Sequence, residues 1–104
     1  MIFISYWELN PDFDPADMAN IAQELISKKI YPPEGVKEIA FYVSTSDNWG
    51  ISIDEADSEE ALARNTAMWR IAKPGIMKFI KTTPAMEVVK ILPILVKLKK
   101  QIKG

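Results

Sequence analysis

The spacing of apolar residues changes several times along this chain, and that pattern restricts what the chain can fold into. In four short segments apolar side chains follow the period of two that predicts β-strands. These predicted strands cover residues 1–8, 36–45, 49–55 and 76–82. Between the first and second strands, and again between the third and fourth, apolar residues recur every three or four positions, which predicts amphipathic helices. A third helical pattern follows the last strand, so the order is βαββαβ plus a C-terminal helix.

Capping residues mark where the three helices are expected to begin. Asp14 suits the N-cap of the first helix, and Asp57 suits that of the second, where an acidic residue three positions later resembles a capping box. Thr83, followed by proline, would cap a third helix that runs to Ile102. That helix contains Pro93, which removes one backbone hydrogen bond, so we expect the helix to be kinked or split.

This order of elements predicts an α+β domain of the ferredoxin-like type. Such a domain has a four-stranded antiparallel sheet with both crossover helices on one face. We assign a single domain to residues 1–104, with a βαββαβ core at 1–82 and the C-terminal helix at 83–104.

The predicted strands are apolar on both faces, so the sheet face without helices would expose a large apolar surface. Either a second copy of the chain or the terminal helix must cover it. The terminal helix is itself apolar almost all round, so we expect it to be buried on more than one side. Pairing through the open sheet face predicts a homodimer.

The chain contains no histidine and no cysteine. These absences exclude Ser-His-Asp triads, cysteine nucleophiles, disulfides, and zinc or haem sites that use either residue. An acidic cluster lies between residues 54 and 60. Its spacing matches no calcium-loop pattern, and its last members suit a helix N-terminus, so we interpret them as capping residues. We predict neither a metal site nor a cofactor.

Charge is divided unequally along the chain. Residues 1–72 hold 13 acidic and 5 basic residues, a net charge of −8, whereas residues 73–104 hold 8 lysines and one acid, a net charge of +7. We favour neutralisation between the two parts, within one chain or across a dimer. No aromatic or arginine side chain is interleaved with the terminal lysines, so we expect no nucleic-acid binding. The sequence shows no cationic leader and no long apolar run, which predicts a cytoplasmic protein without a membrane partner.

Several short motifs in this order resemble those of a known superfamily. They are Met1–Glu8, Pro33-Glu34-Gly35, Ala56-Asp57-Ser58-Glu59, Trp69 and the segment from Phe79 to Pro84. With these motifs the chain resembles the dimeric α/β-barrel superfamily, and within it a small branch of domains of unknown function. The resemblance implies a dimeric barrel, but the superfamily includes monooxygenases, isomerases and ligand sensors, so the fold alone does not decide activity. Its haem-degrading members need an axial histidine, which this chain lacks.

Five residues are candidates for a ligand site: Ser5, Trp7, Tyr42, Asn65 and Trp69. Asn65 and Trp69 are four positions apart, so they share one helix face, which should look at the sheet. A polar residue at an inward position needs hydrogen-bond partners, so Asn65 indicates a wet cavity. Trp69 as a core anchor and Asn65 as a satisfied buried amide are the structural alternative.

From these features we predict a small homodimeric domain that binds a small, partly apolar molecule between helices and sheet. One alternative is a cofactor-independent monooxygenase-like enzyme in which Asn65 and Trp69 orient an aromatic substrate. Another is an interaction module that docks through its basic C-terminal helix on a membrane or an acidic partner. Whether the protein is an enzyme stays open at this point.

Overall fold

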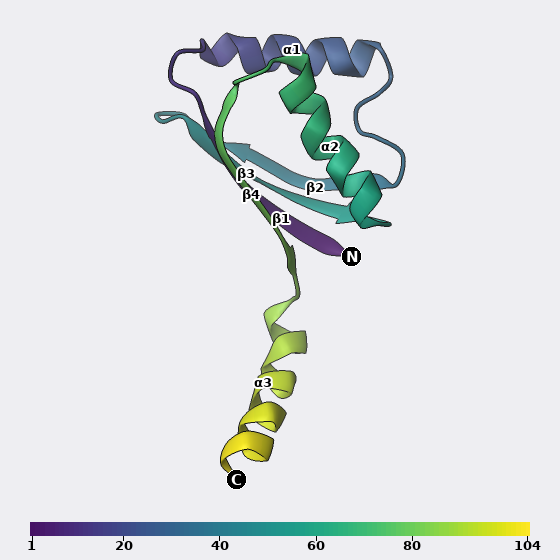
Figure 1. Ribbon diagram of the computed structural model, residues 1–104, viewed down its shortest axis with the longest axis vertical. Coiled ribbons are helices and arrows are strands. Elements are labelled where there is room, and N and C mark those ends of the chain that lie inside the picture. The colour runs from purple at the N-terminus through teal and green to yellow at the C-terminus, as the bar shows by residue number, and fades with distance from the viewer.

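The computed structural model describes residues 1–104 and shows the predicted order of elements (Figure 1). The strands are β1 (Ile2–Leu9), β2 (Val36–Val43), β3 (Trp49–Ala56) and β4 (Met77–Ala85), and the helices are α1 (Pro15–Ser27), α2 (Glu59–Ala72) and α3 (Val88–Lys103). The strands form one antiparallel sheet in the order β2-β3-β1-β4. This topology confirms the predicted ferredoxin-like fold with an additional C-terminal helix.

Strand β1 lies inside the sheet, and its register determines which side chains face the helices. Ser5 is opposite Ser52 of β3 on one side and Thr82 of β4 on the other. Because successive side chains alternate, Phe3, Ser5 and Trp7 share the face covered by α1 and α2. The opposite face, which we call the open sheet face, carries Ile4, Tyr6, Tyr42, Ile51, Ile53 and their neighbours in register.

Strand β2 departs from the regular alternation that its sequence predicts. Glu38 is opposite Asp54, but the next pair joins Ala40 to Ile53, so Ile39 is an extra residue in a β-bulge. Ile39 therefore does not follow the regular alternation of the strand, and its side chain is 50% exposed. The bulge leaves Glu38 opposite Asp54.

The buried core lies between the sheet and the two crossover helices. One cluster joins Phe3, Val36 and Ala56 to the start of α2, and a second joins α1 to Trp69 and Ile76. Only 15 of the 104 residues are buried. The core is small for a chain of this length because α3 contributes no buried residue to it.

The structure confirms the predicted N-cap of α1 and corrects that of α2. Asp14 caps α1, and its side chain accepts a hydrogen bond from the Ala16 amide. Helix α2 is capped by Ser58 instead of Asp57, because the Ser58 hydroxyl accepts from the Ala61 amide at 3.1 Å. The predicted cap was therefore one residue too early.

The end of β4 corrects the predicted boundary between core and terminal helix. Thr83 is opposite Ile4 and Ala85 is opposite Ile2, so the strand continues three residues beyond position 82. Helix α3 begins at Val88, and its N-cap Glu87 makes no side-chain capping bond. The predicted cap at Thr83 is wrong because the full length of β1 offers pairing partners, and a proline is tolerated on an edge strand.

Helix α3 extends away from the rest of the molecule (Figure 1). It runs through Pro93 as one helix, so it is not split. None of its residues is buried. The expectation of burial on more than one side is therefore wrong within a single chain, and α3 leaves the open sheet face of its own chain uncovered. None of the helices combines the length and apolar character needed to cross a membrane.

Candidate functional site

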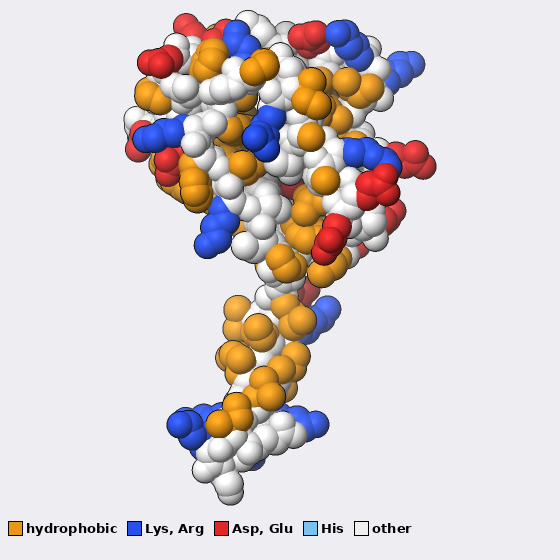
Figure 2. Space-filling model, in the orientation of Figure 1, with side chains coloured by type: hydrophobic (Ala, Val, Ile, Leu, Met, Phe, Trp, Pro, Cys, Tyr) orange, Lys and Arg blue, Asp and Glu red, His pale blue; other side chains and the backbone are white.

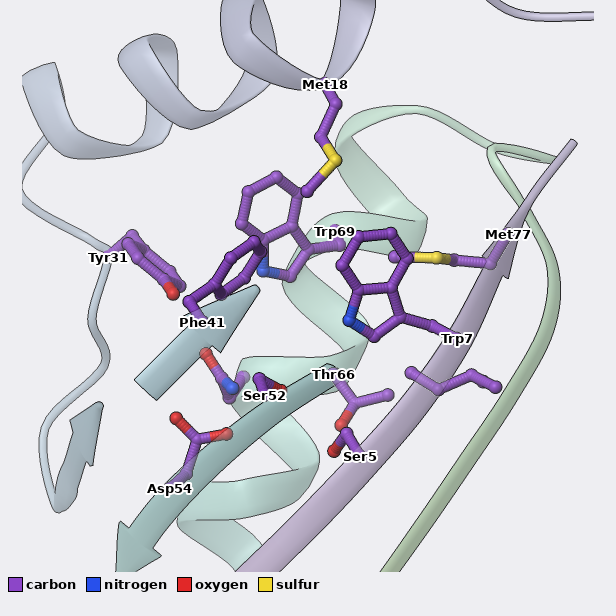
Figure 3. A pocket seen from close by; sticks show the side chains of 12 residues that line it. Ser5, Trp7, Met18, Tyr31, Phe41, Ser52, Asp54, Thr66, Trp69 and Met77 are labelled. Atoms are coloured by element: carbon purple, nitrogen blue, oxygen red, sulfur yellow. The ribbon is translucent and has the colours of Figure 1, made fainter. Parts of the chain in front are cut away.

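A small chamber lies between the sheet and the two crossover helices (Figure 3). Its volume is about 30 Å³, which is room for about one water molecule. Polar side chains occupy part of its wall, namely Ser5, Ser52, Asp54, Asn65 and Thr66. Four aromatic rings occupy much of the remainder, those of Trp7, Tyr31, Phe41 and Trp69. The chamber therefore combines a polar wall with an aromatic one.

A larger cleft adjoins the chamber and opens between α1 and β2. It has a volume of about 360 Å³ and is lined mainly by apolar side chains, among them Ala19, Ala22 and Val43. Met18, Tyr31, Phe41 and Trp69 line both spaces. These four residues therefore form the boundary between an apolar cleft and a small polar chamber, and we call the two together the α1–β2 site.

Four of the five predicted site residues line the chamber. Ser5 and Trp7 come from β1, and Asn65 and Trp69 come from the inward face of α2. Tyr42 does not line it, because strand alternation points Phe41 toward the helices and Tyr42 toward the open sheet face. The Tyr42 side chain is 64% exposed, so its assignment to this site is corrected.

Two polar atoms in the α1–β2 site lack a hydrogen-bond partner. Asp54 Oδ2 and Asn65 Oδ1 are both buried and unpaired. Buried polar atoms are nearly always hydrogen-bonded in proteins, so two unpaired ones in a single cavity need an explanation. By contrast, the Ser5 hydroxyl is satisfied, because its Oγ lies 2.9 Å from Thr82 Oγ1.

Asp54 lies in an environment that opposes its negative charge. Its residue is 2% exposed, and burial raises the pKa of its carboxyl group. The Glu38 carboxylate, which is opposite it across the β2 bulge, raises this pKa further, while the Ser52 hydroxyl acts in the other direction. Asp54 therefore keeps a proton more readily than an exposed aspartate does.

Tyr31 connects the mouth of the site to Glu38. The Tyr31 hydroxyl donates a hydrogen bond to the Glu38 carboxylate. Burial, this bond and the negative charge of Glu38 raise the pKa of Tyr31, so its hydroxyl stays protonated. Its ring meets Trp69 edge to face, with centroids 5.4 Å apart and planes at 78°. Trp69 is thereby held on the boundary between cleft and chamber.

Gly50 makes room for the Trp7 ring on the inner face of β3. A Cβ atom at Gly50 would lie 2.3 Å from Trp7 Cζ2, far closer than real contacts allow. The Trp7 ring also lies 5.8 Å from that of Phe41, centroid to centroid. A glycine within a strand signals such a close approach, and this signal was readable in the sequence.

Other contributors to the site were missed by sequence reasoning. Asp54 was grouped with the acidic residues that precede α2, although the alternation along β3 places it on the same face as Ser52. Tyr31 and Glu38 had no local signal, because their pairing depends on a turn and a bulge. The structure shows no group of three or more acidic side chains that could hold a metal ion.

One family model matches almost the whole chain. It is described as a domain of unknown function, DUF3303, and it covers residues 1–99. The chain belongs to this family. The resemblance to a branch of domains of unknown function is thus confirmed. No curated protein matches the sequence of this DUF3303 domain.

Two solved structures are similar to the DUF3303 domain in fold. One is Rv0793 from Mycobacterium tuberculosis, with 14% identity, a TM-score of 0.49, and coverage of 84% of this chain and 96% of that chain. The other is described as an antibiotic biosynthesis monooxygenase, with 17% identity, a TM-score of 0.46, and coverage of 83% of this chain and 99% of that chain. Likenesses this distant carry no argument about activity. The monooxygenase-like alternative gains no support from them and stays a prediction.

Proposed function

We propose that this domain binds a small, partly apolar molecule that carries a hydrogen-bond donor. The apolar part would occupy the cleft between α1 and β2, and the donor would point into the chamber. One observation carries this proposal. Asp54 and Asn65 each present a buried, unpaired oxygen in a cavity that continues into an apolar cleft.

The cleft suits a flat apolar group. Its volume of about 360 Å³ is in the range of small-molecule sites. Tyr31, Phe41 and Trp69 line it, and aromatic rings favour offset or edge-to-face packing against another ring. We therefore infer that the apolar part of the ligand is a planar ring or a short hydrocarbon.

The chamber favours a ligand that carries a hydrogen-bond donor. A buried polar group without a partner costs about 1–3 kcal/mol, so a hydroxyl or amide N–H that reaches Asp54 and Asn65 would recover part of this cost. Glu38 and Asp54 both bring negative charge to the site, which disfavours an anionic ligand. The expected ligand class is a neutral molecule with an apolar ring and a hydroxyl or amide group.

Three naphthalene probes test this proposal with matched shapes. 1-Naphthol carries the donor, 1-methoxynaphthalene lacks it, and 1-naphthoate replaces it with a negative charge. Binding can be followed by calorimetry and by quenching of tryptophan fluorescence, since Trp7 and Trp69 line the site. We expect naphthol to bind about tenfold more tightly than the methoxy compound, because one hydrogen bond to a buried group contributes about 1.4 kcal/mol. Naphthoate should bind most weakly.

The variant Asn65→Leu tests whether the chamber makes this distinction. We expect it to reduce the preference for naphthol over the methoxy compound, because only Asp54 Oδ2 is left to accept the donor. It should also be about 1 kcal/mol more stable to urea than the wild type, because an unpaired buried oxygen is removed. Asn20→Leu, on an exposed turn of α1, controls for the better helix propensity of leucine. Equal binding of all three probes to the wild type would reject the proposal.

A further inference from the structure

Helix α3 is not expected to be stable by itself. It has 16 residues, which is only just above the length of about 12–15 residues below which isolated helices are marginal in water. It contains Pro93, which costs about 3 kcal/mol in a helix interior, and six β-branched residues, which lower helix propensity. Yet none of its residues is buried in this chain. The helix therefore needs a packing partner that its own chain does not supply.

The surface of the whole chain leads to the same conclusion. Its accessible area is 7546 Å², whereas a compact monomer of 11.8 kDa would expose roughly 5900 Å². Its radius of gyration is 16.8 Å, against about 13 Å for a compact chain of this length. The surplus of about 1600 Å² is twice the roughly 800 Å² that each partner buries in a standard interface. A dimer could thus bury a surface of the usual size.

The open sheet face is a second unpartnered apolar surface on the same molecule. Tyr6 lies between Trp49 and Phe79, with both ring centroids 6.1 Å from its own. Trp49 is 40% exposed and Phe79 is 47% exposed, and Ile4 is exposed at the middle of the sheet. Helix α3 follows the end of β4 and extends away from the sheet, so it does not reach this face in its own chain (Figure 1).

Helix α3 matches the open sheet face of a second copy in length and in pattern. Sixteen helical residues span about 24 Å, close to the roughly 26 Å of an eight-residue strand. Ile91, Leu95, Leu98 and Ile102 form one apolar seam along the helix. Figure 2 shows apolar side chains along the turns near the domain and basic ones toward the tip.

Charge also favours a second copy as the partner. Helix α3 carries five lysines and no acidic residue, whereas residues 1–72 carry a net charge of −8. Residues 1–87, which include all four strands, also carry a net charge of −6, so opposite net charges on α3 and on the rest of the chain favour the association of two copies. An anionic membrane would attract the lysines, but it would repel the acidic domain and leave the open sheet face uncovered.

We propose that α3 is an exchanged arm, which packs in a homodimer on the open sheet face of the other copy. Two-fold symmetry makes the exchange reciprocal, so each copy covers the sheet of its partner. One contact thereby covers both unpartnered apolar surfaces. The proposal does not depend on the ligand proposed for the α1–β2 site.

Cross-linking between two distinguishable copies tests the arm directly. The chain has no cysteine, so an introduced one is unique. A chain with Leu95→Cys, in the middle of α3, is co-expressed with a differently tagged chain with Ile4→Cys, in the middle of the open sheet face. After purification through both tags, a short bismaleimide should link the two kinds of chain. Linkage of only like chains, or no linkage, would overturn the proposal.

A pair of glutamate variants tests whether the apolar seam holds the dimer. By native mass spectrometry we expect the wild type at twice the chain mass of 11.8 kDa. Leu95→Glu should weaken the dimer by about 100-fold or more, because it would bury an unpaired charge. Gln101→Glu introduces the same residue off the seam and should stay dimeric. Far-UV circular dichroism checks that both variants keep the sheet.

Results for the wild type and for the two variants could each contradict the exchanged arm, and two concern the wild type. One is a wild type that stays at the bare chain mass at micromolar concentration. The other is a monomer that floats with phosphatidylserine and phosphatidylcholine vesicles at physiological salt, which would make a membrane the partner of α3. Equal dimer affinity in Leu95→Glu and Gln101→Glu would likewise exclude the seam as the interface.

Discussion

At the scale of single residues, Asp54 and Asn65 are the most informative side chains in this protein. Asn65 could be selected from the sequence, because a polar residue on the inward face of a helix is locally visible. Asp54 could not, because its neighbours along the chain are acidic residues that suit a helix start. Only the pairing of β3 with β2 brings it opposite Glu38 and shows why its charge is unfavourable.

The raised pKa of Asp54 predicts how stability depends on pH. Between the ordinary value of 3.8 and its raised value, the folded protein binds more protons at this group than the unfolded chain does. Stability therefore falls as pH rises through that window. We expect Asp54→Asn to be more stable than the wild type at about pH 7, with a smaller difference near pH 4.

Urea unfolding at several pH values measures this effect. The exposed Asp12 offers a matched control, because Asp12→Asn makes the same chemical change outside the site. We expect the stability of this control to follow that of the wild type across the range. A constant difference between Asp54→Asn and the wild type at all pH values would refute the electrostatic interpretation of Asp54.

At the scale of elements, local signals located the helices and strands but misplaced several ends. The predicted cap of α2 was wrong by one residue because Ser58 and Asp57 are both good N-caps. The path of the backbone decides which of the two side chains accepts the hydrogen bond from the Ala61 amide. The end of β4 shifted further, because strand length depends on the partner β1 and not on the strand itself.

The two candidate caps of α2 can be separated by alanine substitution. We expect Ser58→Ala to lower the free energy of unfolding by about 1 kcal/mol, because the Ala61 amide loses its acceptor. Asp57→Ala should cost clearly less, since the Asp57 side chain makes no capping bond. Urea denaturation of both variants gives the comparison. Equal losses would mean that the two residues share the capping role.

At the scale of the whole molecule, the protein has more apolar surface than its own chain covers. Helix α3 and the open sheet face are both left exposed, and the buried core is small. If the exchanged arm completes the fold, then stability becomes a property of the dimer and depends on protein concentration.

Thermal unfolding at several concentrations tests this dependence. We expect Tm to rise by about 3 °C for each tenfold increase in protein concentration. Each tenfold increase stabilises the dimer by about 1.4 kcal/mol, and the shift in Tm is this free energy divided by the unfolding entropy of the two chains. Leu95→Glu should show little or no rise. A wild-type Tm that stays constant over two decades of concentration would show that the monomer is complete by itself.

Sequence alone determined the order of the elements, the ferredoxin-like topology, the inward position of Asn65 and Trp69, and the absence of histidine and cysteine chemistry. These properties depend on residues close together in the chain, where periodicity and capping act. Tertiary structure decided that Asp54 faces Glu38, that Tyr42 lies outside the site, and that α3 extends away from its own sheet. Each of these three features depends on strand register or on the path of the chain between elements. A β-bulge of one residue, or a strand that is three residues longer, is enough to change which side chains lie opposite one another and where the next helix begins.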